Sequence, residues 1–356
     1  MSEAPPLQEN PITTLSAFFQ HSGAQYQLFD MGRRVVSLSS EMFEQFERCK
    51  QAYAYPLQRH ALVGVIFWDA NRIEHRYVWF LKLPLDEQGL LIPQARDAFL
   101  MMLLDRVGES MMAAADGQKI EGALKDSPYT FKPREEKMAA FNALATSQLQ
   151  LPPSQYFDLA QQYFTGQMTA DNWQQLAMQG VADFAVRLTA ENEVKALADN
   201  LANLPAVPFQ TLCSFLENTQ TPKTLVEAFA AILSKALQAS QPDIPKIAAC
   251  LRAVSHSQET VLVNQMLEQT LTHDVSKDVE VLAVIGGRCW TWLADLELAR
   301  LYCEQLAENN AGQPGFSQLL ADLLYLPGIR TPLMQSIRSE SRSEALTVAV
   351  GEMFGR

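Results

Sequence analysis

The stretch Leu62-Val63-Gly64-Val65-Ile66-Phe67-Trp68 decides the fold of the N-terminal part of this chain. Its side chains are apolar at successive positions, and a β-strand tolerates this only when both of its faces are covered. Turn residues follow at 69–71, and residues 76–85 then alternate in the two-residue period of a strand. The alternation places four side chains on one face, Tyr77, Trp79, Leu81 and Leu83, and Arg76, Val78, Phe80 and Lys82 on the other. We therefore expect residues 62–68 to form a central strand that pairs with residues 76–85.

A second hairpin is expected upstream of this pair. Residues 25–30 alternate between polar and apolar side chains, and Met31-Gly32 can turn the chain because glycine tolerates positive φ. Residues 34–38 would then return as a second strand. With a helix expected after each hairpin, the sequence predicts an α+β domain over residues 10–115, preceded by a flexible tail over residues 1–9.

The sequence changes character after this domain. Glycines and prolines interrupt the pattern over residues 116–134, which we interpret as a linker. Beyond it, helix start signals recur at residue 154, near 190, at 221 and at 257, in steps of about 31 to 36 residues, the length of one helical hairpin. We expect an all-α helical repeat domain over residues 135–356, a HEAT-like irregular solenoid; a compact helical bundle is the alternative.

One apolar stripe is unusually long. Between Leu282 and Leu306 apolar side chains recur every three or four residues, which predicts a single continuous helix. Gly286-Gly287 lies within this stripe, although each glycine costs a helix interior about 1 kcal/mol relative to alanine. We interpret the pair as a close approach of a neighbouring helix, because a phosphate-binding loop would need further glycines and a lysine.

Composition excludes several classes of protein. Hydrophobic residues make up 48% and charged residues 19% of the chain, as in ordinary globular proteins. The longest apolar run, residues 61–68, is far shorter than the roughly 20 residues that cross a bilayer, and no basic, apolar leader is visible. The five cysteines form no CxxC pair, which is typical of free thiols in a reducing compartment. We therefore expect a cytoplasmic protein without a membrane segment.

Negative charge is concentrated in the helical part. Residues 1–133 contain 13 basic and 16 acidic side chains, whereas the remainder contains 15 basic and 24 acidic ones. An acidic surface repels the phosphate backbone that nucleic-acid binders must neutralise. We expect a neutral or basic protein partner and no nucleic acid.

The N-terminal domain contains the basic residues that could bind an anion: Arg33, Arg34, Arg59 and Lys82. Arginine forks match phosphate and carboxylate groups, and neighbouring aromatic residues can stack on bases. The competing interpretation is structural, because the aromatic residues are needed for the core and Arg33-Arg34 can pair with Asp30. No GxSxG, GxGxxG or HExxH motif is present, so catalytic residues stay unknown, and we expect no metal and no cofactor.

Three motifs give the chain a family resemblance: residues 29–34 (FDMGRR), 55–59 (YPLQR) and 80–87 (FLKLPLDE). With them the chain resembles, over nearly its full length, an uncharacterised bacterial family known only as a domain of unknown function. The resemblance implies a bacterial cytosolic protein. It supplies no activity, cofactor or catalytic residue.

Two hypotheses about function follow. The first is a non-enzymatic scaffold or adaptor that binds a protein partner through a helical-repeat surface. The alternative is a sensor of a small anion or nucleotide, or an enzyme, with its site in the N-terminal α+β domain. Whether the chain is an enzyme is left open, with the absence of catalytic motifs favouring a binding protein.

Overall fold

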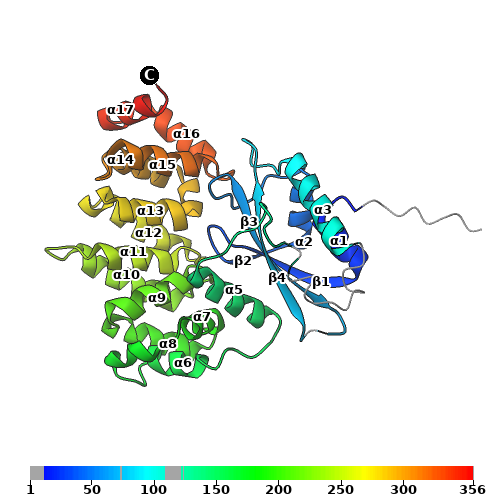
Figure 1. Ribbon diagram of the computed structural model, residues 1–356. Helices are drawn as coiled ribbons and strands as arrows, with labels where there is room; N and C mark the ends of the chain where they lie inside the picture. The colour runs from blue at the N-terminus through cyan, green and yellow to red at the C-terminus, as the bar shows by residue number, and fades with distance from the viewer. Residues whose placement is uncertain (1–11, 73, 109–121, 123, 356) are drawn as a thin grey trace, which may run out of the picture. The chain divides into compact units, whose positions relative to one another are not determined.

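A computed structural model describes residues 12–72, 74–108, 122 and 124–355 (Figure 1). The predicted tail at residues 1–9 lies outside the described residues, as does the part of the predicted linker at 116–121 and 123. The chain divides into two compact units. The first, here called the sheet unit, comprises Met1–Asp30 and Ser37–Lys132; the second, the helical unit, comprises Met31–Val36 and Pro133–Arg356.

The sheet unit contains a four-stranded antiparallel sheet with the strand order β2-β1-β3-β4. Its elements are α1 (Leu15–Ser22), β1 (Ala24–Asp30), β2 (Val36–Leu38), α2 (Ser40–Glu47), β3 (His60–Asp69), β4 (Arg76–Pro84) and α3 (Pro93–Val107). Strand β3 lies between β1 and β4, with Gly64 opposite both Phe29 and Phe80. This confirms that residues 62–68 form a central strand paired with the segment after the turn.

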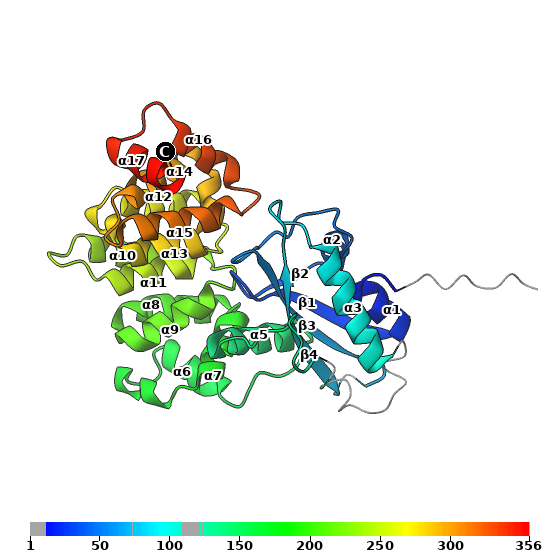
Figure 2. The same cartoon turned by 45° about the horizontal axis from the view of Figure 1, so that its top comes forward.

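Helices α1, α2 and α3 lie on one face of the sheet (Figure 2). Trp79, Leu81 and Leu83 of β4 are all buried in the resulting core, as their alternation predicted. A residue of α2 caps the start of α1: the buried carboxylate of Glu47 accepts hydrogen bonds from the backbone N–H groups of Leu15 at 2.7 Å and of Ser16 at 3.1 Å. These bonds satisfy donors that the first turn of a helix otherwise leaves open. Core packing and this cap together hold α1 against the sheet.

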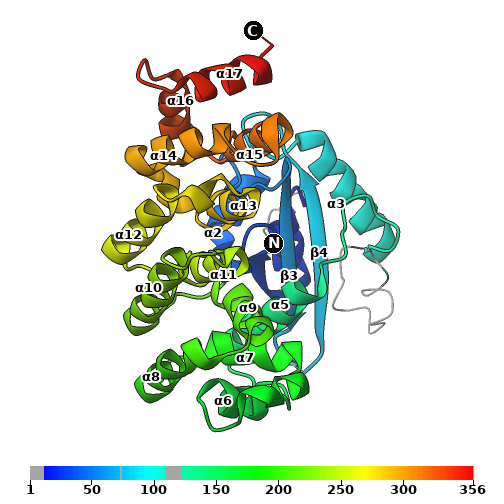
Figure 3. The same cartoon turned by 90° about the vertical axis from the view of Figure 1, so that its left-hand side faces the viewer.

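The helical unit consists of helices stacked in two rows. Its α-helices are α5 (Glu135–Gln148), α6 (Phe157–Phe164), α7 (Met178–Arg187), α8 (Glu191–Asn200), α9 (Ala206–Leu216), α10 (Lys223–Leu237), α11 (Ile244–Val254), α12 (Thr260–Leu271), α13 (Val279–Arg288), α14 (Leu296–Ala307), α15 (Gly312–Leu324), α16 (Arg330–Arg338) and α17 (Glu344–Met353). Helices α5, α7, α9, α11, α13 and α15 follow one another in one row, and α6, α8, α10, α12 and α14 follow in the other (Figure 3). Within each row a helix contacts the helix two places ahead, while α6 with α7 and α10 with α11 pack closely across the two rows.

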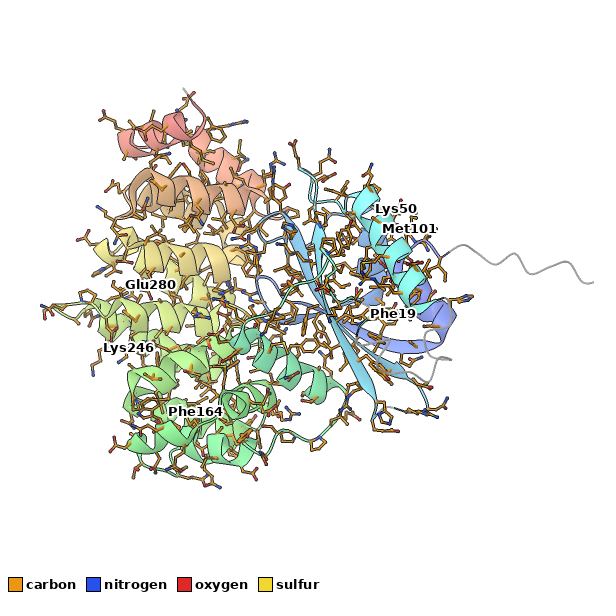
Figure 4. The ribbon with its side chains drawn as sticks, viewed as in Figure 1. Phe19, Lys50, Met101, Phe164, Lys246 and Glu280 are labelled. Carbon is orange, nitrogen blue, oxygen red and sulfur yellow. The ribbon has the colours of Figure 1, made fainter. Side chains whose placement is uncertain are left out.

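Neighbouring rows share one apolar interior. Phe164 of α6, labelled in Figure 4, stacks on Phe184 of α7 with ring centroids 5.4 Å apart. Both side chains are almost completely buried. Such pairs add to the free energy gained by removing apolar surface from water. The predicted start signals lie within three residues of observed helix starts: α6 begins at Phe157, α8 at Glu191, α10 at Lys223 and α12 at Thr260. Asp243 and Asp278 cap α11 and α13 with their side chains.

The prediction of one continuous helix from Leu282 to Leu306 is wrong. Helix α13 ends at Arg288, a 3-10 turn covers Trp290–Ala294, and α14 starts at Leu296. The side chain of Asp295 accepts the N–H groups of the first turn of α14, which makes it a helix start in the middle of the apolar stripe. The three-to-four spacing continues across the break because α13 and α14 both contribute apolar side chains to the same core.

The interpretation of Gly286 as a close approach is confirmed, and Gly287 differs from it. A Cβ atom on Gly286 would lie 2.6 Å from the hydroxyl of Tyr302 on α14 and 3.2 Å from a methyl of Leu323 on α15. Tyr302 is fully buried and donates to the carbonyl of Leu282 at 3.2 Å, so it has no room to move away. A Cβ atom on Gly287 would meet nothing within 4 Å.

The thiols and the helix lengths were the features on which two expectations from composition depended. All five cysteines are free thiols, and four of them are buried: Cys213, Cys250, Cys289 and Cys303. Burial raises the pKa of Cys250 and of Cys289 to about 12, so both stay protonated at neutral pH. Among the described residues, no helix combines the length and the apolar character that crossing a bilayer requires.

Replacing Gly286 and Gly287 by alanine should change the free energy of unfolding in opposite directions. We expect Gly286→Ala to lower the free energy of unfolding by about 1 to 3 kcal/mol through overpacking against Tyr302. Gly287→Ala should raise it by about 0.5 to 1 kcal/mol, since alanine is the better helix former and the site is open. Urea unfolding followed by circular dichroism measures both. Equal effects of the two substitutions would contradict the close approach.

Candidate functional site

Residues Met31–Val36 leave the sheet unit and are held inside the helical unit. Arg33 and Arg34 are only 1% and 4% exposed. Arg33 pairs with Asp322 of α15 at 2.6 Å, and Arg34 donates to the backbone carbonyls of Ser255 at 2.7 Å and Arg288 at 2.5 Å. Both guanidinium groups also lie over the ring of Trp290, at 5.5 and 4.3 Å from its centroid. The two arginines therefore anchor the segment to the helices.

The backbone of the segment is held as well. The N–H group of Val35 donates to Asn218 Oδ1 at 2.8 Å. The carbonyl oxygen of Arg33 accepts from Arg288 Nη1 at 2.6 Å and from Lys137 Nζ at 3.2 Å. Asn218, Arg288 and Lys137 also line a cavity of the helical unit, so the segment and the cavity share side chains.

This cavity has a volume of about 290 Å³ and a lining that consists entirely of polar residues. We call it the Glu217 cavity. Its lining comes from the start of α5, the end of α9, α11 and α13: Arg134, Glu136, Lys137, Ser214, Glu217, Asn218, Arg252 and Arg288. Because α5, α9, α11 and α13 belong to the same row of helices, the cavity follows that row.

Glu217 is the buried centre of the cavity, with only 2% of its side chain exposed. Its Oε2 accepts from Arg252 Nε at 2.7 Å and lies 3.2 Å from Arg288 Nε. Arg252 uses only Nε in this pair; within the described residues, its two Nη groups donate to no protein acceptor. A buried carboxylate thus orients two arginines while leaving donors of at least one of them available.

Electrostatics inside the cavity differ for the two arginines. Burial lowers the pKa of Arg288; Glu217 opposes the shift, and the charges of Arg252, Arg134 and Arg33 add to it. For Arg252 burial acts in the same direction, but the charge and hydrogen bond of Glu217 outweigh it and raise the pKa. Positive charge is therefore crowded around Arg288, and a further negative group would relieve that repulsion.

The sequence candidates for anion binding are distributed over both units. Arg33 and Arg34 lie together over Trp290 in the helical unit. Lys82 is on β4 opposite Leu62, and Arg59 precedes β3 with its carbonyl accepting from the N–H of Leu85 at 2.9 Å.

Sequence reasoning missed the Glu217 cavity altogether. Its basic members lie between residues 134 and 288 of the sequence, and each by itself has the pattern of a surface charge on a helix. The available signal was Glu217 itself, because it directly follows the apolar helix pattern that ends in Phe215 and Leu216.

Neutralising Glu217 should destabilise the helical unit. In Glu217→Gln, Arg252 and Arg288 lose a buried counter-charge, and we expect the free energy of unfolding to fall by about 3 kcal/mol. The matched control is Glu227→Gln, because Glu227 forms an exposed pair with Lys223 in which the side chains are 56% and 65% exposed. That change should cost no more than about 0.5 kcal/mol. Urea titrations that give equal losses for both variants would contradict the role of Glu217.

Comparison with known proteins adds a family and no activity. Residues 10–354 match the family described as "Protein of unknown function (DUF3549)". No curated protein and no solved structure matched the chain. The family match confirms the resemblance carried by the three N-terminal motifs, and it extends over nearly all of the sequence. The chain therefore belongs to the DUF3549 family of proteins of unknown function.

Proposed function

We propose that this protein is a non-enzymatic scaffold or adaptor whose helical unit binds a protein partner. The observation that carries this proposal is the stacking of helices in two rows, each helix on the one two places ahead. The first residues of α9, α11, α13 and α15 are 206, 244, 279 and 312, close to one helical hairpin per step. This arrangement supports a HEAT-like irregular α-solenoid in preference to a compact bundle, and solenoids commonly bind proteins along their length.

The surface chemistry of the helices supports a neutral or basic partner. Residues after 133 contain 24 acidic and 15 basic side chains, which favours association with positive charge. Apolar side chains are also exposed at the first turns of two neighbouring helices of one row: Val261 of α12 is 70% exposed and Leu296 of α14 is 47% exposed. We call these two residues the α12–α14 patch. Apolar anchors surrounded by charge are a common arrangement in protein interfaces.

The composition of the Glu217 cavity supports binding more than covalent catalysis. Its hydroxyl group, Ser214 Oγ, donates to the backbone carbonyl of Thr211 at 2.7 Å and not to a side-chain base. An activated nucleophile requires such a base within hydrogen-bond reach. The alternative of an anion sensor located in the N-terminal domain loses support, since Arg33 and Arg34 group with the helical unit.

For the cellular location we infer the bacterial cytoplasm. Five free cysteines are typical of a reducing compartment. A cytoplasmic adaptor of this kind would meet its partner without crossing a membrane, and we expect neither nucleic acid nor a cofactor to be needed for that contact.

The partner should depend on the α12–α14 patch. We expect the double variant Val261→Asp, Leu296→Asp to recover the partner at least about tenfold less well than the wild-type full chain, since it removes two apolar anchors. The assay is an affinity pull-down from bacterial extract with quantitative mass spectrometry, at low and at high salt. High salt should weaken recovery further, because a partner of opposite charge is screened.

The matched control is Met101→Asp on α3 of the sheet unit (Figure 4), whose side chain is 72% exposed. This variant should recover the partner as the wild type does. Recovery that is unchanged in the double variant, or no protein enriched over a tag-only bait, would contradict a scaffold that binds through these helices.

A further inference from the structure

Independently of any protein partner, we infer that the Glu217 cavity binds the phosphate group of a small phosphate monoester.

The charge of the lining suits a dianion. The cavity has four cationic side chains, Arg134, Lys137, Arg252 and Arg288, and two carboxylates, Glu136 and Glu217. With all of them ionised, the lining carries a net charge of +2. A phosphate monoester carries about −1.5 to −2 at neutral pH, whereas a monocarboxylate carries only one negative charge. The phosphate matches the excess more closely.

The donors are oriented for an anion. Glu217 binds Arg252 and Arg288 through their Nε atoms, at 2.7 and 3.2 Å. In Arg252 this leaves the Nη end of the planar fork, the end that binds phosphate oxygens, without a protein acceptor among the described residues. Because Glu217 is buried and charged, it fixes the fork before any ligand arrives. A fixed donor loses less entropy on binding than a mobile one.

The acidic excess of the surrounding helices directs an anion to the basic side chains of the Glu217 cavity. Four of the 15 basic residues after position 133 line this one cavity, although the same part of the chain holds 24 acidic residues. Anions are repelled elsewhere on such a surface and attracted at this point. The volume of about 290 Å³ admits a phosphate with a small organic portion and lies at the lower end of typical ligand pockets.

Two exposed side chains of opposite charge at the start of α5 allow a test, because neutralising each of them should change the affinity for phosphate in the opposite direction. Arg134 and Glu136 are both exposed and lie two residues apart, so neither substitution should unfold the protein. We expect Arg134→Gln to weaken binding about tenfold, through loss of a charge-assisted contact. Glu136→Gln should instead strengthen it, because the excess positive charge rises. A role limited to holding the helices together would not give these opposite changes.

The experiment is isothermal titration calorimetry on the full chain at low ionic strength in a zwitterionic buffer. The probes are inorganic phosphate, glycerol 3-phosphate and acetate. The proteins are the wild type, Arg134→Gln, Glu136→Gln and the control Lys195→Gln, in which a 71% exposed lysine of α8 outside the cavity is neutralised. Wild type and control should bind glycerol 3-phosphate alike, and more tightly than acetate.

The outcomes decide the inference. Binding of glycerol 3-phosphate at least as tight as that of inorganic phosphate identifies an organic monoester as the ligand class; tighter binding of inorganic phosphate alone overturns that assignment. The site itself is overturned if neither phosphate binds at millimolar concentration, or if acetate binds as tightly. It is likewise overturned if Arg134→Gln and Glu136→Gln shift the affinity in the same direction, or if Lys195→Gln shifts it as much as Arg134→Gln does.

Discussion

The ion cluster of Glu217 with Arg252 and Arg288 is the constraint on which the central part of the helical unit depends. Glu217 ends α9, Arg252 is on α11 and Arg288 is on α13, so one carboxylate joins three consecutive helices of the same row. Ionised groups lose hydration when they are buried, and only close pairing and further hydrogen bonds compensate for that loss. Removing one member therefore leaves the others as uncompensated charges in the packed interior.

The same cluster extends to residues 31–36. Arg288 donates to the carbonyl of Arg33, while the carbonyl of Arg288 accepts from Arg34. Arg33 in turn pairs with Asp322, a residue 289 positions further along the chain. Contacts of such sequence separation require the closure of a long loop, and the entropy cost of that closure slows folding. The helical unit is consequently complete only with six residues from the N-terminal part of the sequence.

Local signals explain which parts of the fold were predictable. The unbroken apolar run at residues 62–68 identified β3, and two-residue alternation identified β4, because each pattern depends only on which faces of a strand are covered. The apolar spacing of residues 282–306 led to the wrong prediction of one helix. The 3-10 turn at Trp290–Ala294 contains apolar residues at the same spacing, so the sequence shows no interruption between α13 and α14. Asp295 was the available signal, because aspartate is a preferred cap and a poor residue for a helix interior.

The functional residues were harder to predict because the same guanidinium group can either hold the fold together or bind a ligand. A guanidinium donates to backbone carbonyls, carboxylates and phosphates alike, and what separates an anchor from a binding group is the identity of its acceptors. Arg33 and Arg34 bind Asp322 and the carbonyls of Ser255 and Arg288, which are acceptors within the fold. Among the described residues, by contrast, Arg252 is hydrogen-bonded only through its Nε. No property of the sequence around these positions distinguishes the two cases, because the acceptors lie far away along the chain.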